Sequence, residues 1–224
     1  MNIPLEIIDL SKTYDSKEAV RSISFKVNEN EIIGILGPNG CGKTTTIGMI
    51  LGLLKPTKGK VLINGIEVEK QRVELLNELN FISPYIELPK KLTVKQNLEV
   101  YGRLYDVKEL SIKIDYLCEK LRLSEFINKI TGELSSGQKN RVSLAKSIIN
   151  DPSVLLLDEP TASLDPETGD FVRSFLEEYQ KEKKTSILLA SHNMAEVERL
   201  CSSVLMMNKG VIIDRGNPQE LIRK

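Results

Sequence analysis

Several features that would mark a specialised class of protein are absent or scarce in this chain. Its 224 residues include no tryptophan and one histidine, and lysine plus arginine equals aspartate plus glutamate at 31 each. This balanced charge gives no reason to expect a nucleic acid or an anionic membrane surface as a partner. The three cysteines, Cys41, Cys118 and Cys201, form no CxxC pair and no disulfide framework. That usage favours a reducing compartment, so we expect a cytoplasmic protein.

Segments that would insert into a membrane are also missing. The N-terminus has neither the basic start nor the apolar core of a signal peptide, so we expect the chain not to be exported. The longest uncharged apolar run, 44–54, is about half of the roughly 20 residues that span a bilayer. Any role at a membrane must therefore come through a partner.

A glycine-rich loop is the most informative stretch that is present. Its residues are Gly37, Pro38, Asn39, Gly40, Cys41, Gly42, Lys43, Thr44 and Thr45. The glycines let successive backbone N–H groups point at the phosphates of a nucleotide, at the N-terminus of a helix. Lys43 would add a positive charge near the β- and γ-phosphates, and Thr44 a hydroxyl ligand for Mg²⁺. A chance glycine turn is the alternative.

A second strand-like run, 154–157, delivers two adjacent carboxylates, Asp158 and Glu159, to its C-terminal end. Open parallel sheets bind their ligands at that edge. Asp158 is suited to hold Mg²⁺, and Glu159 to polarise the water that attacks the γ-phosphate. The alternative is a buried strand that ends in a solvated turn.

Hydrophobic periodicity predicts an α/β chain with a helical insertion. Strands are expected at 5–10, 24–27, 31–36, 61–63, 66–68, 154–157, 185–190, 203–207 and 211–215. Helices are expected at 43–53, 166–181 and 218–224, and a helical pattern fills about 87–147. We therefore expect one domain over 1–224, in which 1–86 and 148–224 form a nucleotide-binding core and 87–147 a helical lobe.

The segment Leu134-Ser135-Ser136-Gly137-Gln138 lies in the helical part, about 90 residues after the phosphate loop. By itself it is typical of a helix start capped by a serine. In this position, just before the strand that leads to Asp158, it makes the chain resemble the ATP-binding subunit of an ABC transporter. The signature of that family is Leu-Ser-Gly-Gly-Gln, and Ser136 replaces its first glycine. The resemblance covers essentially the full length.

The resemblance implies the ABC ATPase fold: a P-loop NTPase core with a parallel sheet, an N-terminal antiparallel β subdomain and an inserted helical subdomain. It also implies ATP and Mg²⁺ as cofactors. Tyr14 matches the aromatic residue that stacks on adenine, and a surface tyrosine is the alternative. His192 matches the histidine that binds the γ-phosphate beside Glu159, and an ordinary histidine at a strand end is the alternative.

In the family two copies face head to tail, with each ATP between one subunit's phosphate loop and the other's signature helix. The resemblance implies that Ser135, Gly137, Gln138 and Asp165 contact ATP across this interface. Asp165 has a structural alternative, because an Asp-Pro turn commonly opens a helix. The partner in the dimer would be a second copy or a homologous ATPase subunit.

The resemblance further implies a transmembrane permease as partner, which would place the chain on the inner face of the cell membrane. The segment 92–101 and the short C-terminus favour export, while the permease would select the substrate. A soluble ABC-type ATPase acting on the ribosome or DNA is one alternative, although such members carry two cassettes or a long coiled-coil insertion. A non-hydrolysing, ATP-dependent assembly module is another.

Two positions depart from the expected pattern. Pro84 stands where most family members carry a glutamine that reaches Mg²⁺ and water, and Ser83 or Tyr85 could substitute for it. Because proline has neither an amide side chain nor a backbone N–H, we expect slow hydrolysis or an altered contact with the permease. Cys41 lies inside the phosphate loop, where it is either a small packing residue or a reactive thiol whose modification would block ATP binding.

Overall fold

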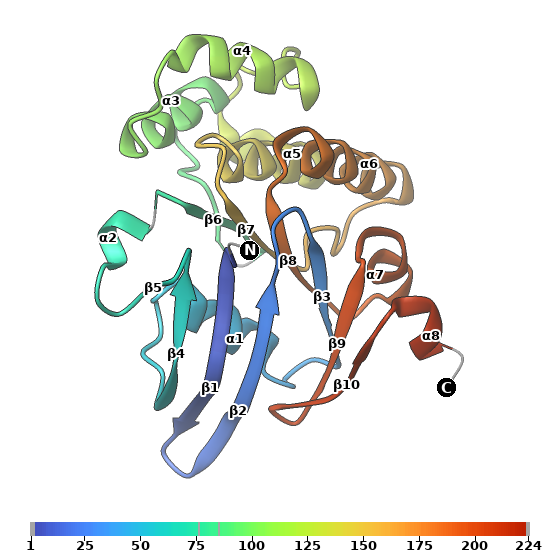
Figure 1. Ribbon diagram of the computed structural model, residues 1–224. Helices are drawn as coiled ribbons and strands as arrows, with labels where there is room; N and C mark the ends of the chain where they lie inside the picture. Colours follow the sequence, from blue (N-terminus) through green and yellow to red (C-terminus); the bar gives the residue numbers. More distant parts are fainter. Residues whose placement is uncertain (1–2, 76, 85, 223–224) are drawn as a thin grey trace.

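The computed structural model contains two β-sheets (Figure 1). It describes residues 3–75, 77–84 and 86–222. The smaller sheet is antiparallel and follows the order β2-β1-β4-β5. Its strands are β1 (Leu5–Tyr14), β2 (Lys17–Val27), β4 (Lys58–Ile63) and β5 (Ile66–Glu67). The larger sheet follows the order β10-β9-β3-β8-β7-β6. Its strands are β3 (Ile32–Leu36), β6 (Leu79–Ile82), β7 (Val154–Asp158), β8 (Ser186–Ser191), β9 (Ser203–Asn208) and β10 (Val211–Gly216).

The larger sheet is parallel except for the antiparallel pair of β9 and β10. Its strands β7 and β8 are buried along their whole length, as expected for continuous apolar runs with both faces covered. Leu36 at the end of β3 pairs with Ser191 at the end of β8, and Asp158 at the end of β7 pairs with Ala190. The parallel register therefore brings the phosphate loop and the two carboxylates to one edge.

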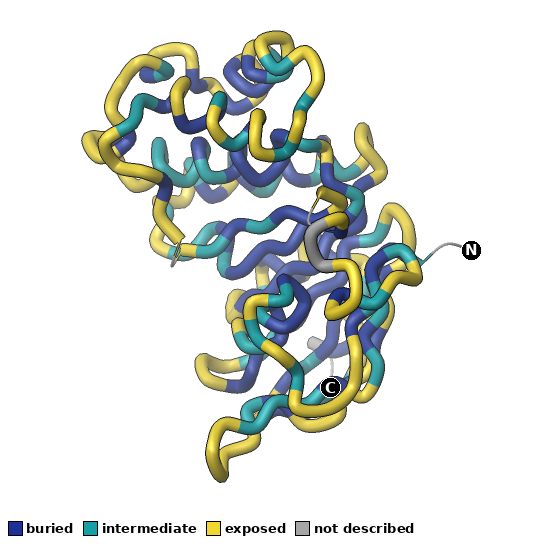
Figure 2. Tube along the Cα trace, turned by 90° about the vertical axis from the view of Figure 1, so that its left-hand side faces the viewer, coloured by how far each residue is buried: buried dark blue, intermediate teal, exposed yellow. Residues whose placement is uncertain are grey.

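Successive residues of these strands face two separate hydrophobic cores. Leu155 and Leu157 of β7 belong to the core shared with the helical part of the chain. Val154 and Leu156 belong to the core between the two sheets. Figure 2 shows the buried strands as a continuous inner layer, with exposed positions concentrated in the connecting loops. This period of two fixes which face of each strand packs on which layer.

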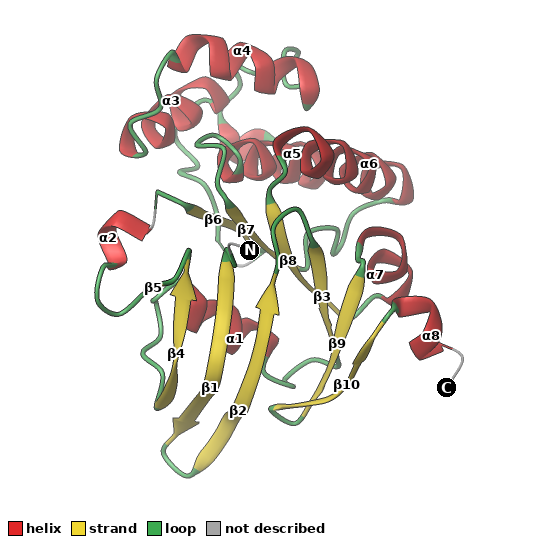
Figure 3. Ribbon diagram, in the orientation of Figure 1, coloured by secondary structure: helices red, strands yellow, loops and turns green. Residues whose placement is uncertain are grey.

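Helices cover both faces of the larger sheet (Figure 3). They are α1 (Lys43–Ile50), α2 (Arg72–Leu75), α3 (Val94–Leu104), α4 (Leu110–Lys120), α5 (Ser136–Ser147), α6 (Pro166–Lys183), α7 (Met194–Leu200) and α8 (Pro218–Ile222), with a 3₁₀ turn η1 at Thr131–Glu133. The apolar side of α1 packs in the core between the two sheets. Helix α5 contacts both α3 and β6, so it joins the helical part to the sheet. Within the described ranges, no helix combines the length and apolarity needed to cross a bilayer.

The predicted boundaries differ from the observed ones in places with a physical cause. Strand β1 runs to Tyr14 rather than ending at residue 10, because bulges interrupt the alternation on which the prediction depended, and Asp9 has a φ of 47°. Helix α1 ends at Ile50 rather than residue 53, because Gly52 takes a φ of 64° and the Leu53 N–H donates to Gly48 O. The final helix was predicted to reach residue 224, and its last two predicted residues lie outside the described ranges.

Candidate functional site

The phosphate loop is a tight connection between β3 and α1. Gly40 and Gly42 have φ angles of 78° and 116°, which place both in the left-handed region that favours glycine. At Gly37, an added Cβ would lie 2.2 Å from the carbonyl oxygen of Met207. These three positions therefore need glycine for backbone shape or for close approach. The loop that results leads directly into the N-terminus of α1, where unpaired N–H groups favour an anion.

Lys43 extends back over this loop. Its Nζ donates to the carbonyl oxygens of Gly37 at 2.7 Å and Pro38 at 3.4 Å. The side chain is only 6% exposed, and its Nζ lies 3.7 Å from Glu159 Oε1. The ammonium group is thus held in place by backbone acceptors of the loop, beside a carboxylate.

Asp158 is buried at the end of β7, beside the first turn of α1. Its Oδ2 accepts hydrogen bonds from Thr44 Oγ1 at 3.2 Å and Ser83 Oγ at 3.5 Å. Burial raises the pKa of Asp158 above its usual range, and the hydrogen bond from Thr44 partly opposes this shift. Its Oδ1 is buried and has no hydrogen-bond partner among the described residues. A nearby cation would satisfy this oxygen and stabilise the ionised form.

The oxygens of Asp158 and Thr44 fit Mg²⁺ better than they fit a metal that is enclosed by protein ligands alone. The described residues contain no group of three or more histidine, cysteine, aspartate or glutamate side chains that could enclose an ion. Mg²⁺ commonly uses one or two protein oxygens, with phosphates and waters completing its octahedral shell. Asp158 and Thr44 could supply oxygen ligands of that kind, since their side chains meet beside the phosphate loop.

Glu159 and His192 form a close pair next to this position. His192 Nδ1 lies 2.7 Å from Glu159 Oε2, and the His192 side chain is 55% exposed. Glu159 has a φ of 51°, an uncommon conformation for a non-glycine residue, and its N–H donates to Ala190 O at 2.8 Å. Its Oε1 is buried without a hydrogen bond from any described residue. A carboxylate held in this way can accept a proton from a water molecule.

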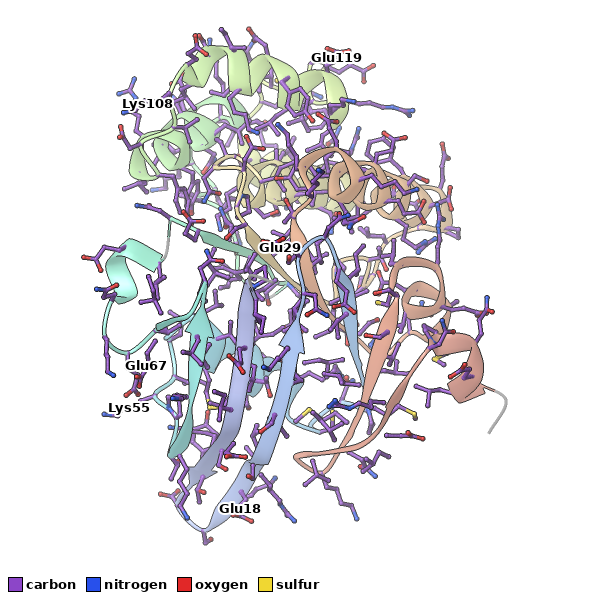
Figure 4. The ribbon with its side chains drawn as sticks, viewed as in Figure 1. Glu18, Glu29, Lys55, Glu67, Lys108 and Glu119 are labelled. Atoms are coloured by element: carbon purple, nitrogen blue, oxygen red, sulfur yellow. The ribbon has the colours of Figure 1, made fainter. Side chains whose placement is uncertain are left out.

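A cleft of about 690 Å³ opens beside Lys43, Asp158 and Glu159, and His192 is not among its lining residues. It is lined by nine of the predicted residues: Tyr14, Asn39, Gly40, Gly42, Lys43, Thr44, Thr45, Asp158 and Glu159. Tyr14 is 44% exposed at its edge, and Lys12 Nζ lies 5.1 Å from the centre of the Tyr14 ring. One face of the ring is therefore in contact with a cation, and a planar base could stack only on the other. Figure 4 shows Glu18, another residue of this cleft, near the tip of the β1–β2 hairpin.

Cys41 is placed differently from its neighbours in the loop. It is 3% exposed and belongs to the core between the two sheets, and it does not line the cleft. Its N–H donates to Pro38 O at 3.2 Å, within the loop itself. This burial favours the packing alternative over the reactive thiol, because a reagent can reach Cys41 only when the loop opens.

The four residues expected to act across a dimer do not line the cleft around Lys43 in this chain. Ser135 caps α5: its Oγ accepts from Gln138 N at 3.3 Å, and the Gln138 side chain accepts from Ser135 N at 3.0 Å. Asp165 caps α6 by accepting from Thr168 N at 2.9 Å, and this hydrogen bond lowers the pKa of Asp165. Gly137 lies against Thr168. Ser135 and Asp165 thus serve as helix caps, which was the structural alternative for each. The N-terminal ends of α5 and α6 remain exposed.

Pro84 lines a separate cavity of about 230 Å³ between the helical part and the core. Asp158 and Glu159 reach the same cavity, so the position is close to the carboxylates even though proline offers them no hydrogen bond. Ser83 contacts Asp158 directly, whereas Tyr85, the other proposed substitute, lies outside the described residues.

Two side chains that support the site are absent from the sequence-based predictions. Asn140 of α5 donates through Nδ2 to Pro160 O at 2.8 Å, which connects the signature helix to the loop after Glu159. Glu196 of α7 is buried and accepts hydrogen bonds from Thr161 and Ser191. Polar residues within helices normally indicate a solvated face, so the sequence alone carried no signal for either contact.

The fold and the site together define a class: a P-loop nucleotide-binding domain in which a carboxylate pair follows another parallel strand of the same sheet, two positions from the strand that leads to the phosphate loop. Residues 20–162 match the family described as ABC transporter. The chain is 35% identical to the ABC transporter ATP-binding protein NatA of Bacillus subtilis, over 97% of this chain and 91% of that protein. It therefore belongs to the ABC transporter family and is related to the ATP-binding proteins of that family.

Other relatives agree with this assignment. The chain is 37% identical to Nod factor export ATP-binding protein I of Rhizobium etli, over 97% of this chain and 69% of that protein. Among solved structures it resembles cbiO1 from Clostridium perfringens, described as part of the ABC transporter complex cbiONQ, with a TM-score of 0.87 and 30% identity over 100% of this chain and 92% of that one. The predicted family and the predicted ABC ATPase fold are confirmed.

Proposed function

We propose that this chain hydrolyses MgATP and thereby powers export of a substrate through a separate transmembrane permease. The observation that carries the proposal is the group formed by Lys43, Asp158, Glu159 and His192 at one edge of the parallel sheet. Export is supported by the relative from Rhizobium etli, whose name describes an export ATP-binding protein. The permease, and a location on the inner face of the cell membrane, are parts of the same proposal.

Each group has a distinct task in this proposal. The N–H groups of the phosphate loop and Lys43 would bind the phosphates, and Thr44 and Asp158 would hold Mg²⁺, which neutralises charge on the phosphates when it is bound. Glu159 Oε1, which accepts no hydrogen bond from the described residues, would take the proton of the attacking water. His192 would fix the orientation of Glu159 through their 2.7 Å contact and bind the γ-phosphate. Tyr14 would stack on adenine.

A second subunit would complete the site. Ser135, Gly137, Gln138 and Asp165 lie at helix starts outside the cleft of their own chain, which supports a role toward ATP held by the facing copy. The first N–H groups of a helix have no partner within the helix, so the N-terminus of α5 could bind the γ-phosphate. The dimer would then be stable only while that phosphate links the two halves.

The experiment that tests the proposal combines turnover with identification of partners. The purified protein is expected to release phosphate from ATP only when Mg²⁺ is present. The tagged Glu159→Gln variant, isolated with MgATP from gently solubilised cells, is expected to retain a multi-span membrane protein. Ribosomal or DNA-repair proteins in its place would overturn the transport role. ATP-dependent assembly without phosphate release would instead support the assembly module.

Pro84 provides a separate test of how this loop affects the rate. We expect Pro84→Gln to raise basal phosphate release about two- to ten-fold, because one added hydrogen bond near Asp158 is worth about 0.5–1.5 kcal/mol. Pro84→Leu is the matched control, since it restores the backbone N–H without adding an amide, and it should leave the rate near that of the parent. Equal rates for both variants and the parent, with and without the permease, would contradict the slow-hydrolysis hypothesis.

A further inference from the structure

A buried carboxylate lies behind the Glu159 and His192 pair. Glu196, in the first turn of α7, is 2% exposed. Its Oε1 accepts a hydrogen bond from Thr161 Oγ1 at 2.7 Å, and its Oε2 accepts one from Ser191 Oγ at 2.7 Å. Both distances are those of ordinary O–H···O hydrogen bonds. Both carboxylate oxygens are therefore engaged, one by each of two loops.

The two hydroxyl groups come from the segments that carry the reacting side chains. Thr161 lies two residues after Glu159, and Ser191 immediately precedes His192. Glu159 and His192 themselves touch at 2.7 Å. The two hydrogen bonds of Glu196 thus close a ring of contacts that joins the ends of β7 and β8.

The positions of Glu159 and His192 depend on contacts with surrounding residues. Glu159 has a left-handed backbone conformation, which persists only where the surroundings hold it. His192 is mostly exposed, so packing contributes little to its position. Ser191 Oγ also accepts from the Asn193 N–H at 3.0 Å, which connects the hydrogen bonds of Glu196 to the residue that caps α7. The Glu196 carboxylate, which lies outside both loops, therefore hydrogen-bonds to both at once.

We propose that Glu196 is a positioning residue for ATP hydrolysis: through Thr161 and Ser191 it fixes the relative position of Glu159 and His192. This inference rests on the hydrolytic function proposed above. Glu196 does not line the cleft. Its contribution should be confined to the chemical step, because small displacements of reacting groups lower the rate far more than they lower ground-state binding.

The test removes the hydrogen bond between Thr161 and Glu196 while it keeps the size of the side chain nearly constant. Thr161→Val deletes the hydroxyl at nearly constant volume, and we expect kcat to fall about ten-fold while KM for MgATP changes less than about two-fold. Thr161→Ser restores the hydroxyl and should restore kcat. Thr185→Val is the matched control, because Thr185 is a buried threonine immediately before β8, at the end opposite to His192. Parent-like kcat in Thr161→Val, or an equal loss in Thr185→Val, would overturn the proposal.

A second measurement needs no turnover. The chain contains a single histidine, so the imidazole signals in its proton NMR spectrum belong to His192. We expect these signals to move in Thr161→Val and to stay in place in Thr161→Ser and Thr185→Val. Unchanged signals in Thr161→Val would refute the positioning role. If the signals move but the parent protein releases no phosphate from MgATP, the positioning of the pair stands and the proposed hydrolytic function fails.

Discussion

Replacing Glu159 by glutamine is expected to lower the rate of MgATP hydrolysis by about 10²–10⁴-fold, the usual contribution of a positioned general base. Glutamine keeps the size of the side chain and can still contact His192, but it cannot accept a proton from water. MgATP binding should persist, because Lys43, Thr44 and Asp158 are unchanged. Single-turnover phosphate release and equilibrium binding of MgATP would separate the two effects.

The same variant should also accumulate as an ATP-bound dimer, since the step that would release the two halves is blocked. Size-exclusion chromatography with and without MgATP measures this. Glu119→Gln is a matched control, because Figure 4 shows Glu119 on the outer surface of the helical part, far from the edge that carries the site. It should turn over at the parent rate and show no stabilised dimer. A Glu159→Gln variant that keeps more than about a tenth of the parent rate would show that another group accepts the proton.

The elements that depend on local sequence were the most predictable. The phosphate loop combines glycines, a lysine and a threonine at fixed spacing, and this pattern predicts a strand before the loop and a helix after it. Both β3 and α1 begin within one residue of their predicted starts. Strands β7 and β8 were found because continuous apolar runs indicate strands covered on both faces. Their parallel pairing then places Asp158 and Ser191 at one edge, as the strand-helix alternation implied.

Features that depend on tertiary contact were not predictable in the same way. The core position of Cys41 is set by packing between two sheets, whereas its place in the sequence left a packing residue and a reactive thiol as alternatives. Helix α7 is short, and its cap by Asn193 becomes evident only from the hydrogen bonds to Ala195 and Glu196. The buried state of Glu196 depends on hydroxyl groups 35 and 5 residues away. No local pattern encodes partners at such separations.

Lys43→Ala is expected to weaken MgATP binding by about 10- to 100-fold. A hydrogen bond to a charged group is worth about 1.5–3 kcal/mol, and each 1.4 kcal/mol corresponds to a factor of ten. The structure adds a reason for the upper part of that range. Backbone acceptors of the loop already hold the ammonium group in place, so little side-chain entropy is lost when phosphate binds. Titration of the purified variant with MgATP measures the change.

Lys17→Ala provides the comparison, because Lys17 lines the same cleft but is exposed on the β1–β2 hairpin. An exposed charge contributes at most about 1 kcal/mol and is screened by salt, so affinity should fall less than about five-fold and the difference should shrink at high ionic strength. The loss in Lys43→Ala should persist in salt, because Lys43 is buried beside Glu159. Equal losses for the two variants would mean that the cleft attracts ATP by its overall charge and that the phosphate loop has no special role.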